Sequence, residues 1–223
     1  MYKLATLSQL PAFLESLDTP SKLKLQEHGR LLLFKKGEVL AREDERIPHL
    51  LYIISGYAAV TCRGQATFLI SSNQVFPSSR LAPSKLGLRA LGVGTAAILD
   101  KETLDLVYAK NPQLLLTVFD QTVQKLHENA QINALRQVHP TEINLLALLW
   151  QSSWALPNGT REIPKEYDQH LLAEILGIQR EEVSRRRKDL VNSGLLFKDM
   201  SSSILSADVP KVLMSAGADY AVV

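Results

Sequence analysis

Residues 30 to about 98 alternate between short β-rich runs and tight turns, and this alternation restricts the possible folds more than any other feature of the chain. The run Leu31–Phe34 leads into a turn at Gly37, and the run Leu50–Ile54 leads into a second turn at Gly56. Short strands at this turn spacing are typical of a β-sandwich or a β-roll. We therefore expect a β-domain in the first half of the chain.

Helical patterns flank the β-rich region on both sides. Two short helices are expected before it, at about Ser8–Leu17 and Thr19–His28. A long helix is expected after it, because Asn111 is placed to cap a helix and Pro112 lies where its missing N–H costs nothing. Seam residues recur in it every three or four positions: Leu115, Phe119, Thr122, Leu126, Ala130 and Asn133. Such a seam predicts a homodimer. Leu114 and Val118 lie off the seam and are expected to contact the chain's own β-domain. The alternative is that the whole helix packs on that domain.

A mostly buried helix is predicted next, from a cap at Thr141 to about Ala155. Its apolar residues are Leu145, Leu146, Leu148, Leu149, Trp150 and Trp154. A turn at residues 157–159 and a short strand at Arg161–Ile163 follow.

The segment that begins at Asp168 has the outline of a helix-turn-helix. Asp168 is a good N-cap for a short helix, and Gly177 ends that helix where a positive φ is often needed. Gln179 is placed to cap a second helix after the tight turn. The apolar runs 195–197 and 204–205 then predict a β-hairpin wing.

The second helix carries polar side chains along one side: Gln179, Arg180, Glu181, Ser184, Arg185 and Lys188. An arginine fork can pair with guanine O6 and N7, and a glutamate can accept from cytosine N4; each good bidentate pair is worth about 1–3 kcal/mol of discrimination. Lys188, Arg186 and Lys198 are candidates for phosphate contacts. The alternative is a solvated helix face, because acidic residues in the same helix oppose the cations.

These features together resemble the CRP/FNR superfamily of bacterial transcription regulators over nearly the whole chain. Gly37 and Gly56 match the turn glycines of the superfamily's β-roll. The segment Leu172–Gly177 followed by Arg180–Arg185 matches its DNA-reading motif closely. The motif match is the specific one, since turn glycines alone occur in many folds.

The resemblance implies roles for individual residues. Arg180, Glu181 and Arg185 occupy positions that read base edges, and His170 occupies a position where a phosphate contact is usual. A dimer of this kind binds a palindrome whose half-sites are about 34 Å apart. The loop at residues 156–160 lies where relatives touch RNA polymerase.

The chain departs from the family pattern at the ligand pocket. Cyclic-nucleotide binders of the superfamily hold the ribose with a glutamate and the cyclic phosphate with an arginine. No acidic residue lies between Arg46 and Asp100, so we expect no binding of cyclic AMP. Arg80, Lys85 and Arg89 lack a local counter-charge and are a candidate pocket for an unknown anionic effector; the alternative is that they are exposed loop cations and that no effector exists.

A second departure is the pair Arg186 and Arg187, because these positions are usually apolar in the family. At least one of the two must bury its aliphatic stem beside the core. The seating of the recognition helix is therefore the least predictable part of the motif.

The cysteine and histidine content limits which metal, disulfide and redox sites the chain can form. The single cysteine, Cys62, excludes intramolecular disulfides and Cys-based zinc or iron–sulfur sites. No histidine lies at metal-ligand spacing from another histidine or from Cys62, so no metal and no cofactor are expected. Cys62 beside Arg63 is a candidate redox site, with an inert thiol as the alternative. From the sequence pattern we also expect no signal peptide, no membrane-spanning run and no catalytic constellation.

The sequence thus predicts a cytoplasmic α+β transcription regulator that is not an enzyme. Residues 1–110 form a β-roll of the cyclic-nucleotide-binding type, residues 111–137 a dimerisation helix, and residues 138–223 a winged helix-turn-helix whose helix 179–191 reads double-stranded DNA. The net charge of +2 neither supports nor opposes this function. The alternatives are a cupin-like β-roll enzyme with a helical accessory domain, and a dimeric adaptor that has lost DNA binding.

Overall fold

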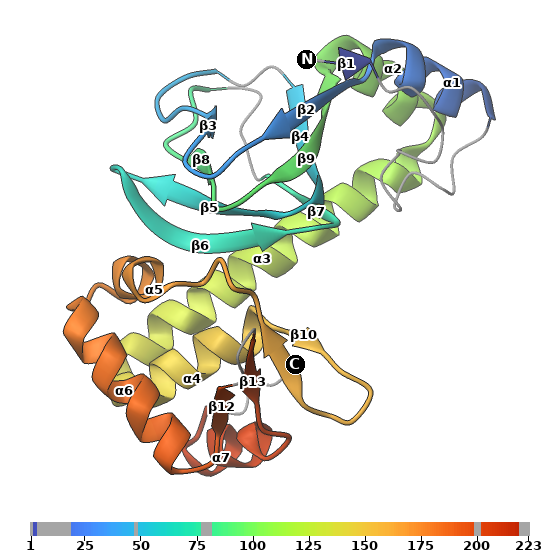
Figure 1. Ribbon diagram of the computed structural model, residues 1–223. Coiled ribbons are helices and arrows are strands. Elements are labelled where there is room, and N and C mark those ends of the chain that lie inside the picture. Colours follow the sequence, from blue (N-terminus) through green and yellow to red (C-terminus); the bar gives the residue numbers. More distant parts are fainter. Residues whose placement is uncertain (1, 4–18, 47–48, 77–81, 199–201, 219–223) are drawn as a thin grey trace. The chain divides into compact units, whose positions relative to one another are not determined.

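The computed structural model describes residues 2–3, 19–46, 49–76, 82–198 and 202–218 (Figure 1). The chain forms two compact units, residues 1–125 and residues 126–223. The helix predicted at 8–17 lies outside the described residues. None of the described helices is both long enough and apolar enough to cross a membrane.

The first unit contains two antiparallel sheets, as Figure 1 shows. The first sheet has the order β1 (Tyr2–Lys3), β2 (Arg30–Phe34), β9 (Gly94–Asp100), β4 (His49–Ser55), β7 (Gln74–Val75). The second has the order β3 (Val39–Ala41), β8 (Gly87–Ala90), β5 (Tyr57–Cys62), β6 (Gln65–Ser71). The predicted β-domain is therefore confirmed, with β1 as a strand that the sequence did not indicate.

The core of this unit is filled by apolar side chains from both sheets. A cluster of fully buried residues includes Leu51, Ile53, Val60, Ile70 and Leu88. Phe34 packs so closely on Gly94 that a Cβ added there would lie 2.4 Å from the ring atom Cζ. Position 94 therefore admits no side chain without displacement of the ring or of the backbone of β4.

The helices that the structure describes wholly or partly in this unit are α1 (Thr19–His28), α2 (Lys101–Lys110) and α3 (Pro112–Val138). The bounds of α1 and the start of α3 agree with the prediction, whereas α2 was missed. Asn111 lies between α2 and α3, and its side-chain amide donates to Ser21 Oγ at 3.1 Å and to Val107 O at 3.2 Å. Asn111 therefore joins α1 to the end of α2.

The long helix α3 separates its apolar residues onto different faces. Val118 packs against the buried cluster of Tyr52, Val75 and Ala97 in the first unit, as predicted. Leu115, Phe119 and Leu126 of the predicted seam, and Leu116 beside it, remain about half exposed. These residues therefore form an apolar strip on α3 that the described residues of the chain leave about half exposed.

The second unit combines helices with one small sheet, and its topology is that of a winged helix-turn-helix (Figure 1). The helices are α4 (Thr141–Gln151), α5 (Gln169–Leu176), α6 (Arg180–Asn192) and α7 (Val209–Ser215). The antiparallel sheet has the order β10 (Trp154–Ala155), β11 (Arg161–Ile163), β13 (Ser203–Leu205), β12 (Leu196–Lys198). The fully buried residues Leu145, Leu149 and Leu172 contribute to its core.

The prediction for α4 was wrong at both ends. The N-cap is Pro140, with no side-chain cap, and the helix ends at Gln151 and not near Ala155. Ser153 Oγ donates to Trp150 O at 2.8 Å, and the backbone then pairs with β11, with Trp154 opposite Glu162. Pairing with β11 therefore ends the helix, although the apolar helical pattern of the sequence continues to Trp154. As a result, Trp154 is exposed instead of lying in the core.

Candidate nucleic-acid interface

Local capping fixes the corner between α5 and α6. Asp168 Oδ1 accepts hydrogen bonds from the backbone N–H groups of His170 at 3.0 Å and Leu171 at 2.9 Å. Gly177 adopts φ +66°, and the N–H of Ile178 bonds back to Ala173 O at 3.1 Å. A Cβ at Gly177 would meet no atom within 4 Å, so glycine is favoured here because of its positive φ and not because a side chain would collide with neighbours. Both sequence predictions for this helix are confirmed.

The helix α6 is seated by its buried residues. Val183 and Leu190 are fully buried and face the core, as predicted. Gln179 is the N-cap residue, but its side chain makes no capping hydrogen bond. The predicted DNA-reading residues on α6 and at its cap lie on the outside. Ser184 is partly exposed, and the other five are exposed: Gln179, Arg180, Glu181, Arg185 and Lys188. His170, at the start of α5, is also exposed.

Glu182 organises two of the arginines of α6. It pairs with Arg185 and, at 2.8 Å, with Nε of Arg186. Arg186 also lies 3.5 Å from Asp189 and 4.0 Å from Glu142 on α4. The hydrogen bond from Arg186 to Glu182 and these carboxylates raise the pKa of Arg186. Arg186 is therefore engaged within the unit, which makes it a weak candidate for a phosphate contact.

Of the two arginines at positions that are usually apolar in the family, Arg187 is the one that is buried. It is only 9% exposed, and its Nη2 donates to Ser203 Oγ of β13 at 3.1 Å. Its Nε has no hydrogen-bond partner among the described residues. Burial lowers the pKa of the guanidinium from its ordinary value.

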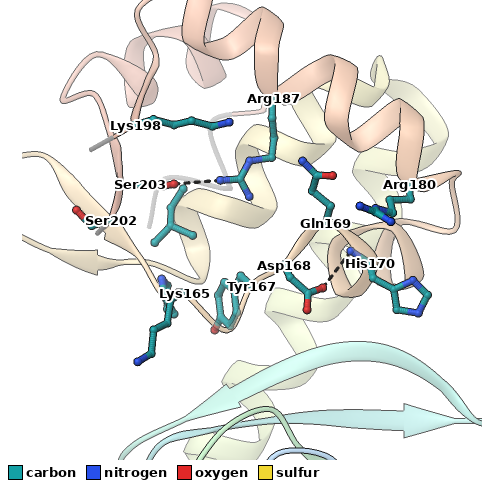
Figure 2. A pocket seen from close by; sticks show the side chains of 12 residues that line it. Lys165, Tyr167, Asp168, Gln169, His170, Arg180, Arg187, Lys198, Ser202 and Ser203 are labelled. Carbon is teal, nitrogen blue, oxygen red and sulfur yellow. Dashed lines mark hydrogen bonds between the residues drawn. The ribbon is translucent and has the colours of Figure 1, made fainter. Parts of the chain in front are cut away.

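Arg187 points into a cavity of about 690 Å³ between the helix-turn-helix and the wing. Figure 2 shows the lining side chains, which come from the β11–α5 connection, from α5 and α6, and from the wing strands. The cavity brings together His170 and Arg180, two of the predicted DNA-binding residues, with Arg187 and Lys198. No sequence signal pointed to this cavity, because its residues are spread along the chain from Ile163 to Ser203.

Two of the three candidate effector residues, Lys85 and Arg89, lie in the described part of the first unit. Lys85 pairs with Asp44, and this hydrogen bond raises the pKa of Lys85. The expectation that Lys85 lacks a counter-charge was therefore wrong. The counter-charge is Asp44, which is distant in the sequence. The backbone N–H of Asp44 donates to Ser84 O and so holds the 42–45 loop beside Lys85. Arg89 lies on β8, and Arg80 is outside the described residues.

Glu43 is a structural carboxylate that sequence reasoning missed. It accepts from Thr61 Oγ1 at 2.7 Å and from the N–H of Gly64 at 3.0 Å. These hydrogen bonds, the one from Thr61 first, lower the pKa of Glu43 despite partial burial. Glu43 thereby holds the β5–β6 turn, in which Arg63 has φ +53°; the partly buried Cys62 is the last residue of β5 before this turn.

Known structures share this architecture over most of the chain. FixK2 from Bradyrhizobium japonicum matches with a TM-score of 0.70 and 17% identity, over 84% of this chain and 96% of that one. A CooA mutant from Carboxydothermus hydrogenoformans matches with 0.69 and 14% identity, over 97% and 100% of the two chains. The chain has the CRP/FNR fold. A transcriptional regulator of the CRP family from Thermus thermophilus shares this CRP/FNR fold, with a TM-score of 0.63 and 16% identity over 83% and 96%.

Comparison of the sequence with known proteins adds little to this evidence from structures. No protein-family model matches the chain. Lysophospholipase NTE1 from Cryptococcus neoformans var. neoformans serotype D is 42% identical over 55 residues, which are 25% of this chain. The same residues make up 3% of that enzyme, so the match carries no argument about activity.

Proposed function

We propose that this protein is a sequence-specific DNA-binding transcription regulator without catalytic activity, acting as a homodimer. One observation carries the proposal: α6 presents Arg180, Glu181 and Arg185 to solvent from a helix whose seating is fixed on its other side. The CRP family regulator from Thermus thermophilus, which has the same fold, supports it. Neither the cupin-like enzyme nor the adaptor has a comparable feature in its favour.

The exposed side of α6 suits the major groove. Arg180 and Arg185 offer planar donor forks that match guanine O6 and N7, and Glu181 offers an acceptor for cytosine N4. Lys188, Gln179, Ser184 and His170 border them and are proposed to contact the sugar–phosphate backbone, which adds affinity without sequence information.

The dimer is proposed to form along α3. An apolar strip of this kind in a 27-residue helix is typical of a helix–helix interface. A two-fold axis along the strip would present two copies of α6 to half-sites one helical turn apart. The predicted division at 1–110, 111–137 and 138–223 belongs to this proposal, as does a contact of the 156–160 loop with RNA polymerase.

Regulation is proposed to be independent of cyclic AMP. The roll has no acidic residue between Arg46 and Asp100 for the ribose hydroxyl, and Lys85 is already paired. Cyclic AMP should therefore give no heat of binding in calorimetry and leave the affinity for DNA unchanged. A saturable heat with a matching change in DNA affinity would contradict this part of the proposal.

Selection of duplexes from a random pool tests the function directly. The wild type should enrich an inverted repeat, and Arg180→Ala should weaken binding to that repeat far more than to random DNA. Lys188→Ala should weaken both alike, and Arg42→Ala, an exposed arginine of the first unit, should weaken neither. Failure to enrich any sequence would reject sequence-specific binding.

Analytical ultracentrifugation tests the dimer. Phe119→Glu and Leu126→Glu place a charge in the strip and should shift the protein to monomers. Leu106→Glu changes a comparably exposed leucine on α2 and should leave the dimer intact. A wild type that sediments as a monomer at all concentrations would reject the dimer.

A further inference from the structure

Arg187 is a buried cation whose hydrogen-bonding capacity is largely unused. Its guanidinium carries five N–H donors, yet Ser203 Oγ is the single acceptor bonded to it among the described residues, and Nε is without a partner. A buried charge without a counter-ion is costly, and arginine stays charged at any ordinary pH. The arrangement is therefore incomplete without an anion.

The cavity around Arg187 has an excess of positive charge. Its described lining includes the cations Lys165, Arg180, Arg187 and Lys198. The acidic residue among them is Asp168, whose Oδ1 already caps α5 through two backbone N–H groups. An anion that entered would meet donors and little repulsion.

The wing strands aim their polar residues into this space. Ser203 of β13 stands opposite Lys198 of β12 in the sheet register, and both line the cavity. Figure 2 shows Lys198 extending toward the Arg187 side chain, whereas Lys165 points away from it. An anion beside Arg187 would therefore be reached from α6 by a planar fork and from the wing by an ammonium and a hydroxyl.

We infer that this cavity binds a phosphate group, with Arg187 and Lys198 as its charged ligands and Ser203 beside them. Guanidinium groups match phosphate oxygens in a bidentate geometry, which a spherical anion such as chloride cannot use. The backbone of bound DNA is the source that the structure favours, because His170 and Arg180 line the cavity and lie on the proposed DNA-binding face. That choice of source rests on the proposed function, whereas the phosphate site does not.

Inorganic phosphate tests the site without DNA. In ¹⁵N-labelled full-length protein, phosphate added at constant ionic strength against chloride should shift the Arg187 Nε–H resonance and the amide resonances of Lys198 and Ser203 to saturation. Arg187→Met should abolish the two amide shifts, Arg187→Lys should weaken them, and Arg42→Met should leave them intact. The inference is overturned if the wild type shows no saturable shift at Arg187, or if Arg187→Met keeps the amide shifts.

A labelled duplex of mixed sequence distinguishes the two sources of phosphate. If the DNA backbone occupies the site, the duplex displaces inorganic phosphate, and Arg187→Met raises Kd about tenfold for every sequence. The slope of log K against log salt then falls in magnitude by about 0.9. An unchanged Kd and slope in Arg187→Met, with the phosphate shifts present, assigns the site to a free phosphate-bearing solute. A wild type that binds no duplex rejects the proposed function, while the phosphate titration still decides the site.

Discussion

Arg185, a proposed base-reading residue, is held in an ion pair by Glu182, which stands one helical turn earlier on α6. Glu182 also binds Arg186, so one carboxylate restrains two neighbouring cations. DNA would therefore compete with Glu182 for Arg185, and breaking that pair offsets part of the binding free energy.

Glu182→Gln should strengthen DNA binding. The Arg185 side of the pair is exposed, and an ion pair at the surface is worth up to about 1 kcal/mol, so its removal should lower Kd by up to about fivefold. Fluorescence anisotropy with the selected duplex measures the change. Glu102→Gln, which removes an exposed carboxylate on α2, is the matched control and should leave Kd unchanged. Weaker binding by Glu182→Gln would instead show that the pair positions Arg185 for DNA.

Asp168→Ala should loosen the start of α5. The substitution removes the side-chain acceptor for two backbone N–H groups, and loss of such an N-cap costs about 1 kcal/mol. Hydrogen exchange should show a drop of this size in the opening free energy of the α5 amides, while the amides of β5 stay as protected as before. Asp168→Asn keeps an acceptor and should retain most of the protection. Equal protection in Asp168→Ala would mean that the cap is not a source of stability.

Gly94→Ala should be strongly destabilising because the new methyl group collides with the Phe34 ring and with the backbone carbonyl of Ser55. We expect a loss of about 3 kcal/mol in the free energy of unfolding of the first unit. Gly64→Ala is the comparison, since Gly64 has φ +75° but open space around its Cβ position; it should lose about 1 kcal/mol. Urea unfolding followed by circular dichroism measures both, and equal losses would reject the steric argument.

Glu43 should make the first unit sensitive to acid. Its pKa in the folded protein lies below the ordinary value of 4.5, so the charged form is stabilised by folding. This contribution is fully present above pH 4.5 and is lost as the pH falls through the lower, folded-state pKa. The stability difference between the wild type and Glu43→Gln should therefore shrink below pH 4.5 in urea titrations at a series of pH values. A difference that stays constant with pH would show that Glu43 acts through shape and not through charge.

Local signals in the sequence predicted the fold well. The Asp168 cap and the Gly177 turn depend on residues within a few positions of one another, so they could be read without tertiary information. Val118 could likewise be assigned to the intramolecular face of α3 from periodicity alone. The β-domain followed from turn spacing in the same way.

Long-range pairing explains what the sequence did not predict. The end of α4 depends on the register between Trp154 and Glu162, and the partner of Lys85 is Asp44, which lies 41 positions earlier. The cavity at Arg187 needs the wing and α6 to be assembled first. For the proposed site, the exposed residues of α6 were predictable from helical spacing, whereas the buried arginine was known only as a departure from the family pattern.

Both tryptophans of the chain belong to the second unit, and their surroundings differ. Trp150 is 7% exposed, with the guanidinium of Arg161 at 5.0 Å from its ring centre, whereas Trp154 is 48% exposed. Indole emission is therefore an intrinsic optical signal for this unit alone, and a soluble quencher such as acrylamide should extinguish the Trp154 component first. Circular dichroism sees both units, so a mismatch between the two unfolding curves would measure how far the β-roll and the winged domain melt independently.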